Sequence, residues 1–482
     1  MMSQRVALVW FRNDLRLEDN PALHHALSLG YHVLPIYIHS EEENLTWKTG
    51  RASCWWLHHS LASLDESLQA HGSRLFLFQG RSLNTLLSLI QESQASAVFW
   101  NRRYEPEIIV RDKNIKEVIK SQGVEADSFN GSLLHEPWTI QNKSNLPFQV
   151  FTPFWKTALA ITHPSPPLTV PHLIPLPHQL PKSVPLDTLQ LLPKIPWDQQ
   201  FYTTWKPGEE GAHRNLADFI QRAFSDYREG RNIPSEKGTS RLSPHLHFGE
   251  ISPRQLWHAF AKAFPATTDW QSSQYLTEIG WREFAHHLLY HFPQTPLHPL
   301  RPAFEKFAWN KINPKMLDAW KKGNTGVPIV DAGMRELWAT GWMHNRVRMI
   351  TASFLVKNLR YPWIEGAQWF WDTLLDADLA ANTLGWQWSA GCGADAAPYF
   401  RIFNPVTQGE KFDSEGTYIR RWIPELSTLP SDWIHHPWEA PAEVLQRAKV
   451  TLGIHYPHPL LCLSKSRTEA LEAFKNLKNP NL

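Results

Sequence analysis

Short apolar runs alternate with helical patterns along the first 130 residues. The runs cover Val6–Phe11, Val33–Ile38, Leu75–Phe78 and Ala97–Trp100. Their apolar residues are consecutive rather than alternating, which is typical of strands buried on both faces. Between the runs, apolar residues recur at helical spacing, at Leu57, Leu61, Leu64 and Leu68 and again at Leu83, Leu86, Leu87 and Ile90. This alternation predicts an α/β domain over residues 1–133, with a doubly wound, Rossmann-like parallel sheet.

The pattern changes after residue 133. Ten prolines lie between Pro164 and Pro196 without any periodicity, and proline fixes φ and lacks an N–H group, so we expect 134–200 to be an extended linker over the surface between two domains. From 201 to 482 strand patterns almost disappear, which predicts a larger, all-α second domain. Its helical stretches include Ala217–Phe224, Leu256–Phe264, Leu276–His291 and Met343–Leu359, with a final helix and a frayed end after residue 465.

The charge of the chain is nearly balanced, with 48 Lys and Arg against 46 Asp and Glu and a formal net charge of +2. This balance excludes a polybasic protein that holds nucleic acid by overall charge alone, although a local basic groove remains compatible with it. Hydrophobic residues make up 42% of the chain and charged residues 20%, a composition that excludes wholesale disorder.

The three cysteines, Cys54, Cys392 and Cys462, are too few and too widely spaced for a disulfide framework or a zinc motif, which indicates a reducing compartment. The apolar run before Arg12 is shorter than a signal peptide requires, and no stretch approaches the length of a membrane span. We therefore expect a soluble, cytoplasmic protein with no membrane partner.

The segment Gly238-Thr-Ser-Arg-Leu-Ser-Pro244 joins a loop to a predicted helix. Small hydroxyl residues and free backbone N–H groups at a helix start bind anions such as phosphate, and Arg241 would add charge. The structural alternative is an ordinary N-cap followed by proline at the first helical position.

Glu278, Trp281 and Arg282 are three and four residues apart in a helical pattern, so they share one face. A carboxylate, a flat ring and a guanidinium on one face could bind a heteroaromatic ligand. An intrahelical Glu–Arg pair beside a core tryptophan explains the same pattern equally well.

Arg346 and Arg348 lie in an otherwise apolar helical stretch and need carboxylate partners, because an unpaired buried charge is costly. Asp376 and Asp378, followed closely by Asn382, could supply them. These residues form either a structural salt-bridge cluster or a cofactor pocket. A D-x-D pair could also bind Mg²⁺, but the arginines compete for it, so we expect no metal site.

Tryptophan is unusually frequent, with 24 residues. Most of them are expected to fill the core, where each indole N–H needs a partner. Trp386 and Trp388 are separated by one residue, and with Trp363 and Trp309 they could form a path of stacked rings. Spacing alone does not decide between these interpretations.

Several long motifs occur in one order along essentially the whole chain. They are W-F-R-N-D-L-R-L-E-D-N (10–20), G-T-S-R-L-S-P (238–244), W-R-E-F (281–284), T-G-W-M-H-N-R-V-R-M (340–349), D-A-D-L-A-A-N (376–382), G-W-Q-W (385–388) and R-I-F-N-P (401–405). This set resembles the photolyase/cryptochrome family and, within it, the class I cyclobutane pyrimidine dimer photolyases. The family fold is an N-terminal α/β domain, a long linker and a helical FAD-binding domain, in agreement with the pattern described above.

The resemblance implies FAD bound in a U shape within the helical domain. The residues that match the flavin site of the family are Tyr227, Thr239, Ser240, Arg241, Leu242, Ser243, Tyr275, Arg282, Arg348, Asp376, Asp378 and Asn382. Asn382 would lie at flavin N5. Asparagine there is similar to photolyases, whereas plant cryptochromes typically carry Asp and animal cryptochromes Cys.

The resemblance also implies a substrate and an electron path. Residues matched to contacts with a flipped-out dimer are Glu278, Trp281, Asn345, Met349 and Trp388, and those matched to positions near DNA are Arg231, Arg346 and Gln408. Trp386, Trp363 and Trp309 match the tryptophan chain that photoreduces the flavin. Glu278 would be catalytic as well, because a protonated or proton-sharing carboxyl stabilises the dimer radical anion.

Four positions depart from the family pattern. Tyr275 stands where many members have Trp, and Thr383-Leu384 replaces a common Asn-Gly. Gly280 replaces a bulky residue between Glu278 and Trp281. Asn345 after His344, in place of a second histidine, disfavours a six-four photolyase.

The implied activity is that of a deoxyribodipyrimidine photo-lyase, a carbon–carbon lyase in which photoexcited reduced FAD lends an electron to a dimer in UV-damaged DNA. One alternative is a cryptochrome-like photoreceptor that binds FAD without repair; another is a dark flavin oxidoreductase, but no G-x-G-x-x-G follows the first predicted strand. The family also carries a folate or deazaflavin antenna, or none, in the α/β domain, where Glu105 in the segment 101–106 matches a folate contact. We expect a monomer.

Overall fold

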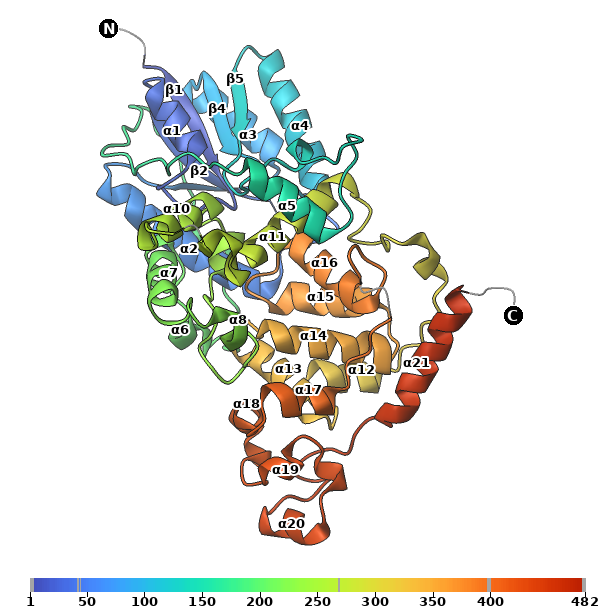
Figure 1. Cartoon of the computed structure of the whole chain (residues 1–482). Coiled ribbons are helices and arrows are strands. Elements are labelled where there is room, and N and C mark those ends of the chain that lie inside the picture. The colour runs from blue at the N-terminus through green and yellow to red at the C-terminus, as the bar shows by residue number, and fades with distance from the viewer. Residues whose placement is uncertain (1–3, 41–42, 44, 268, 397–399, 479–482) are drawn as a thin grey trace. The chain divides into compact units, whose positions relative to one another are not determined.

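The computed structural model describes residues 4–40, 43, 45–267, 269–396 and 400–478 (Figure 1). The chain forms two compact units. The first contains the N-terminal part up to Trp197 together with Trp205–Gln221 and Ser240–Pro293. The second contains Asp198–Thr204, Arg222–Thr239 and the chain from Gln294 onward. The chain therefore enters each unit more than once.

The first unit contains one five-stranded sheet, in which all strand pairs are parallel. The strands are β1 (Val6–Phe11), β2 (His32–His39), β3 (Phe76–Gln79), β4 (Ala97–Asn101) and β5 (Glu125–Phe129). Their order is β3-β2-β1-β4-β5, so the winding reverses between β1 and β4. The helices that connect them are α1 (Pro21–Ser28), α2 (Arg51–Ala70), α3 (Ser82–Ser93) and α4 (Pro106–Ser121).

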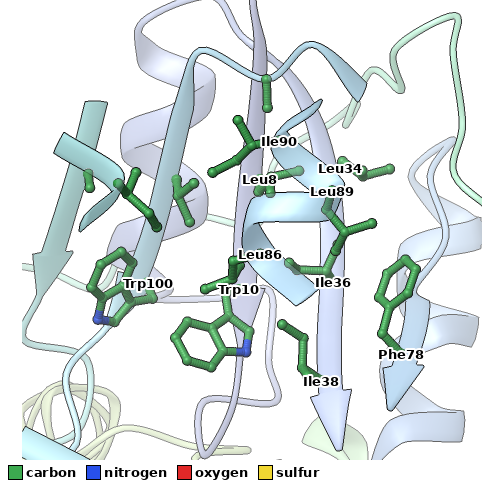
Figure 2. Close-up of a cluster of buried hydrophobic side chains, with 14 of the residues drawn as sticks. Leu8, Trp10, Leu34, Ile36, Ile38, Phe78, Leu86, Leu89, Ile90 and Trp100 are labelled. Carbon is green, nitrogen blue, oxygen red and sulfur yellow. The ribbon is translucent and has the colours of Figure 1, made fainter. Parts of the chain in front are cut away.

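The sheet is apolar on both faces. On one face, Leu8, Trp10 and Trp100 pack with Leu86 of α3 (Figure 2). Ile115 of α4 belongs to the same buried cluster. On the other face, Phe99 of β4 meets His25 of α1 edge to face, with ring centroids 4.9 Å apart. Because helices cover both faces, the central strands carry continuous apolar runs, and these runs made the strands predictable.

The predicted doubly wound sheet is confirmed, and all four predicted strands are present within one or two residues of their expected bounds. The fifth strand, Glu125–Phe129, escaped prediction because it lies at the sheet edge and only Ala126 is buried. The apolar-run signal does not apply to such a half-exposed edge strand.

The stretch predicted as a linker has some structure of its own. It contains η1 (Pro137–Thr139), α5 (Phe151–Ile161) and η2 (Leu186–Leu189), and α5 buries Phe154 and Trp155. From Thr162 to Pro185 there is neither helix nor strand, as the prolines indicated. The first compact unit extends past residue 200, and the domain bounds 1–133, 134–200 and 201–482 stay predictions.

The chain from Phe201 onward is helical, and among its described residues the β-structure is limited to the isolated bridge Leu452–Tyr456. Its α-helices are α6 (Phe201–Thr204), α7 (Glu209–Arg222), α8 (Tyr227–Gly230), α9 (Ser243–His247), α10 (Pro253–Ala263), α11 (Gln274–His291), α12 (Pro314–Lys321), α13 (Pro328–Thr340), α14 (Asn345–Ser353), α15 (Trp363–Thr373), α16 (Leu379–Ala390), α17 (Pro405–Phe412), α18 (Thr417–Trp422), α19 (Ser431–Ile434), α20 (Ala442–Arg447) and α21 (Leu463–Lys478). Short 3-10 turns lie at Asp269–Ser272, Pro302–Lys306, Pro424–Leu426 and Pro437–Glu439. In the second unit α13, α14, α15 and α16 pack together as neighbours (Figure 1).

The helical predictions hold with two corrections. The predicted stretch 217–224 ends at Arg222, and the stretch 343–359 is α14 followed by a π-helix, η5 (Phe354–Asn358). The final helix after residue 465 is α21, while the expected frayed end, 479–482, lies outside the described residues. No helix in the described part of the chain is both long and apolar enough to cross a membrane.

Candidate functional site

Two glycines shape the loop that precedes α9. A Cβ atom on Gly238 would collide with the carbonyl group of Gly230, so the backbone approaches itself more closely there than any other residue would permit. Tyr227 of α8 is buried, and the Arg231 guanidinium lies 5.7 Å from the centre of its ring. Tyr227, Arg231 and Thr239 all belong to the second unit.

The loop continues in the first unit with a strained residue. Arg241 has a positive φ of 51°, a conformation that non-glycine residues rarely adopt. Its guanidinium lies 5.5 Å from the centre of the Trp205 ring. The helix α9 begins at Ser243 with Leu242 as N-cap, which makes no side-chain cap hydrogen bond, so Pro244 stands at the second helical position rather than the first.

Tyr275 is buried and donates a hydrogen bond to Ser240 Oγ at 3.3 Å. Burial raises the pKa of the Tyr275 hydroxyl to about 12. A hydroxyl that stays protonated at every physiological pH acts as a fixed donor. Tyr275 thereby links α11 to Ser240 within the first unit.

The helix α11 presents the predicted ligand-binding face. Glu278 accepts a hydrogen bond from Gln274 Nε2 at 2.7 Å, and Trp281 stacks on Phe151 with ring centroids 3.8 Å apart and an angle of 7° between the planes. The stacking fixes the indole plane. Arg282 donates to the Ser132 carbonyl at 2.7 Å, so it ties α11 to the chain after β5.

Gly280 is explained by its neighbour. A Cβ atom there would lie 2.5 Å from the Trp155 ring of α5, so α11 and α5 pack this closely only with glycine at position 280. The departure from the family pattern therefore reflects helix packing. Sequence reasoning also missed Glu283, which is buried and accepts hydrogen bonds from the backbone N–H groups of Leu134 and His135. Burial raises its pKa.

The two arginines of α14 have different partners. Arg348 forms an ion pair with Asp376, with 2.8 Å between Nη2 and Oδ2, as predicted. Arg346 instead donates to Asn232 Oδ1 at 2.5 Å, and its guanidinium lies 4.4 Å from the centre of the Phe412 ring. The interpretation that the aspartates pair with both arginines is thus confirmed for Arg348 only.

The N-terminus of α16 explains the spacing of the D-A-D-L-A-A-N motif. Asp378 is the N-cap and accepts a hydrogen bond from Ala381 N at 2.8 Å. Asn382, one turn later, donates from Nδ2 to the Ala367 carbonyl of α15 at 3.0 Å. Asp378 thus has a structural role, whatever else it binds.

Trp386 is buried between α15 and α12. Its ring centroid lies 5.0 Å from Phe370 and 6.2 Å from Trp320. A Cβ atom on Gly366 would overlap its ring. Sequence reasoning missed Gln387 in the same motif, whose side chain bonds to Thr295 O, His298 O and Leu300 N. A polar residue between two tryptophans was the available signal.

The other predicted aromatic residues lie in separate places. Trp363 is the buried first residue of α15. The ring centroid of Trp309 lies 4.5 Å from that of Phe307, and the ring centroid of Trp388 lies 6.4 Å from that of Phe403. Gln408 lies in α17. The electron path and the DNA contacts stay predictions.

The predicted site residues fall into two groups by compact unit. The first unit holds Ser240, Arg241, Leu242, Ser243, Tyr275, Glu278, Trp281 and Arg282. The second unit holds Tyr227, Arg231, Thr239, Trp309, Asn345, Arg346, Arg348, Met349, Trp363, Asp376, Asp378, Asn382, Trp386, Trp388 and Gln408. Within the second group, α14 places Asn345 and Met349 one turn apart, and Arg346 Nη1 lies 3.8 Å from the Met349 sulfur.

The parallel α/β sheet and the helical residues 275–476 are shared with known proteins. Residues 7–172 match the DNA photolyase family, and residues 275–476 match the FAD binding domain of DNA photolyase. The chain therefore belongs to the photolyase/cryptochrome family.

Three relatives define the comparison. A deoxyribodipyrimidine photo-lyase from Agrobacterium fabrum is 48% identical over 98% of both chains. Cryptochrome-1 from Arabidopsis thaliana is 40% identical over 98% of this chain and 70% of its own. A bacterial class III photolyase from Agrobacterium tumefaciens has a crystal structure that matches with a TM-score of 0.95 at 46% identity, covering 99% of this chain and 98% of that one. The expected class I assignment thus finds no support.

Proposed function

We propose that this chain is a light-driven DNA repair enzyme that splits cyclobutane pyrimidine dimers, with the activity of a deoxyribodipyrimidine photo-lyase. The observation that carries the proposal is the face of α11, where Trp281 is held flat by stacking on Phe151 and Glu278 lies less than one turn away. A flat aromatic wall beside a carboxyl group suits a planar, hydrogen-bonding pyrimidine pair. The photo-lyase relative at 48% identity supports this assignment.

A dimer inside a duplex has to leave the base stack before it reaches such a wall, and photolyases are among the enzymes known to flip their target out. The fused bases pair poorly, so the lesion is easier to extrude than intact bases. In our proposal Trp281 excludes water from the lesion, while Glu278 hydrogen-bonds the pyrimidine edges. Phosphate-directed contacts from Arg231, Arg346 and Gln408 hold the flanking DNA.

The residues of the second unit fit a flavin nucleotide. Asp376 is buried and paired with Arg348 through Oδ2, while its Oδ1 atom receives no hydrogen bond from any residue that the structure describes. A buried acceptor without a donor suits a ligand hydroxyl or amino group. When bound and reduced, FAD supplies a light-driven electron that opens the cyclobutane ring and then returns, so no net redox change occurs.

A second chromophore also finds fitting residues, in the α/β domain. Trp10 Nε1 and Arg12 Nε are buried donors without a partner among the described residues, and both lie at the carboxyl end of β1, where the sheet changes winding direction. Ligands of doubly wound folds bind at that position. We infer that an antenna, a folate or a deazaflavin, binds near them. Glu105, the predicted folate contact, forms an ion pair with Arg103 at 2.5 Å.

Of the photolyase classes, we infer class III, because the solved class III photolyase shares 46% of its residues with this chain. The monomeric state and the cytoplasmic location stay predictions. A cryptochrome-like photoreceptor is the second candidate, and the relatives named cryptochrome favour it. Asn382, in place of the aspartate typical of plant cryptochromes, favours repair.

Repair is tested by incubating the purified, chemically reduced protein with UV-irradiated DNA and counting dimers in blue light and in darkness. We expect dimers to disappear only in light. A protein that binds FAD yet leaves the dimer count unchanged in light is a photoreceptor, and the repair proposal would then be abandoned.

A further inference from the structure

Lys357 is a buried lysine that none of the predicted roles uses. Its side chain is 1% exposed, and it lies in the π-helix Phe354–Asn358, which directly continues α14. A π-helix inserts an extra residue into a helical turn, and such insertions are rare and frequently mark functional positions. The insertion matters here because of where the Lys357 side chain ends.

The Lys357 ammonium group lies at the C-terminal end of α16. Nζ donates to the carbonyl of Ala390, the last residue of that helix, at 2.8 Å, and it lies 3.0 Å from the centre of the Phe400 ring. The next residue, Gly391, has a positive φ of 87°, and a Cβ atom there would lie only 3.4 Å from Nζ. Glycine thus closes the helix and leaves room for the ammonium. Both the helix end and the ring attract a cation.

This placement is costly for the protein. Among the described residues no carboxylate lies within ion-pair distance of Nζ, and burial lowers the pKa of Lys357 well below its ordinary value. The neighbouring Cys392 does not supply a negative charge, because burial raises the pKa of its thiol to about 12. A hydrocarbon side chain would fill the same space without this desolvation. Packing alone therefore does not account for an amine at this position.

The end of α16 bears two residues of the proposed function. Trp386 lies one turn before Ala390, and Trp388 lies between them in sequence. Gln387 ties the same turn to the backbone at 295, 298 and 300, and its own carbonyl accepts hydrogen bonds from the N–H groups of 391, 392 and 393. Lys357, from the π-helix Phe354–Asn358, binds the same turn through the Ala390 carbonyl.

We propose that Lys357 is a positioning residue, which fixes the C-terminal turn of α16 and thereby the places of Trp386 and Trp388. The proposal deepens the proposed function and rests on it for the role of the two tryptophans. It does not rest on DNA repair as such, because Trp386 would also serve photoreduction in a photoreceptor. Catalysis is sensitive to small displacements, since a shift of about 1 Å can cost up to ~100-fold in rate.

The test uses the full-length, flavin-bound protein and three variants. Lys357→Met removes the amine and keeps the length of the side chain, Lys357→Gln keeps a donor without charge, and Lys315→Met is the matched control on the exposed surface of α12. We expect Lys357→Met to retain bound FAD and to slow photoreduction of the flavin by about tenfold. Lys357→Gln should recover part of the rate, and the control should match the wild type.

Hydrogen exchange provides a readout that requires neither light nor flavin. The amides of 391–393 should exchange faster in Lys357→Met than in the wild type. In the variant the last turn of α16 has lost its hydrogen bond from Lys357 and keeps only the side-chain bonds of Gln387. Unchanged photoreduction together with unchanged exchange would overturn the proposal. If Lys357→Met does not fold, Lys357→Gln decides. Normal exchange at 391–393 with photoreduction slowed by clearly less than tenfold supports the proposal, and normal exchange with photoreduction slowed by tenfold or more overturns it. If the wild type binds no flavin, the proposed function fails, and exchange alone decides for Lys357.

Discussion

At the level of single residues, Glu278 is the acid whose protonation the proposed chemistry uses. It accepts a hydrogen bond from Gln274 within α11. We expect Glu278→Gln to retain most of the repair per absorbed photon, because an amide still donates to a pyrimidine edge. Glu278→Ala should lose about tenfold, since a missing partner for a buried polar group costs roughly 1–3 kcal/mol.

The measurement is the number of dimers split per absorbed photon by the chemically reduced proteins. Glu443→Gln, at an exposed position in α20, is the control and should equal the wild type. Equal yields from the wild type, Glu278→Gln and Glu278→Ala would exclude a role for the Glu278 carboxyl group.

His287 is a second residue whose protonation has a measurable effect. Its Nε2 accepts a hydrogen bond from Phe148 N at 3.0 Å, so Nδ1 carries the proton and donates to the Pro137 carbonyl at 3.0 Å. Burial lowers the pKa of His287 to about 4. Between pH 6.5 and 4 the folded chain therefore binds fewer protons than the unfolded chain, and stability falls as the pH falls.

The size of this effect follows from the shift of the pKa. We expect His287 to account for a loss of about 3 kcal/mol in the free energy of unfolding across that window. Chemical denaturation of His287→Gln at pH 7 and pH 4.5 should show a smaller loss than the wild type, because glutamine keeps one donor and one acceptor but does not titrate. His163→Gln, on the surface, should keep the full loss.

At the level of helices, glycine sets the spacing of α15 and α16. A Cβ atom on Gly366 would overlap the ring of Trp386, whereas a Cβ atom on Gly385 would meet nothing within 4 Å. We expect Gly366→Ala to lower the free energy of unfolding by about 1–3 kcal/mol and to slow photoreduction, because the indole has to move. Gly385→Ala, the matched control, should be neutral or up to about 1 kcal/mol more stable. Denaturation curves and the photoreduction rate report both effects, and equal values for the two variants would contradict the packing argument.

The strands and helices also show which parts of the structure could be predicted from the sequence. Val6–Phe11 was predicted with its observed bounds because a strand buried on both faces is apolar at every position. The pairing of Arg348 with Asp376 was predictable because an arginine in an apolar helix needs a carboxylate. The hydrogen bond from Arg346 to Asn232 was not predictable, because 114 residues separate the partners and an asparagine amide accepts hydrogen bonds from many kinds of donor. Gly280 likewise made sense only once Trp155 was seen to pack against it.

At the level of the whole molecule, a net charge of +2 means that any attraction for DNA has to be local. We expect the affinity for damaged DNA to fall as salt rises, with a slope set by the number of phosphates contacted. Arg231→Gln should weaken binding and reduce the slope of log K against log salt by about 1. Titrations at several salt concentrations measure this slope. Arg447→Gln, which removes an exposed charge next to Glu443, should weaken binding less and leave the slope unchanged.

The way the chain divides between its two compact units affects its synthesis. The first unit is complete only once Ser240–Pro293 has been made, although its sheet ends at Phe129. At the usual rates of translation, the ribosome needs roughly 5 to 20 seconds to extend the chain from Trp197 to Pro293. During that interval the nascent N-terminal part still lacks α10 and α11. A gene cut near residue 200 would therefore divide the first unit between two fragments, so the N-terminal fragment would depend on co-expression with the other to complete that unit.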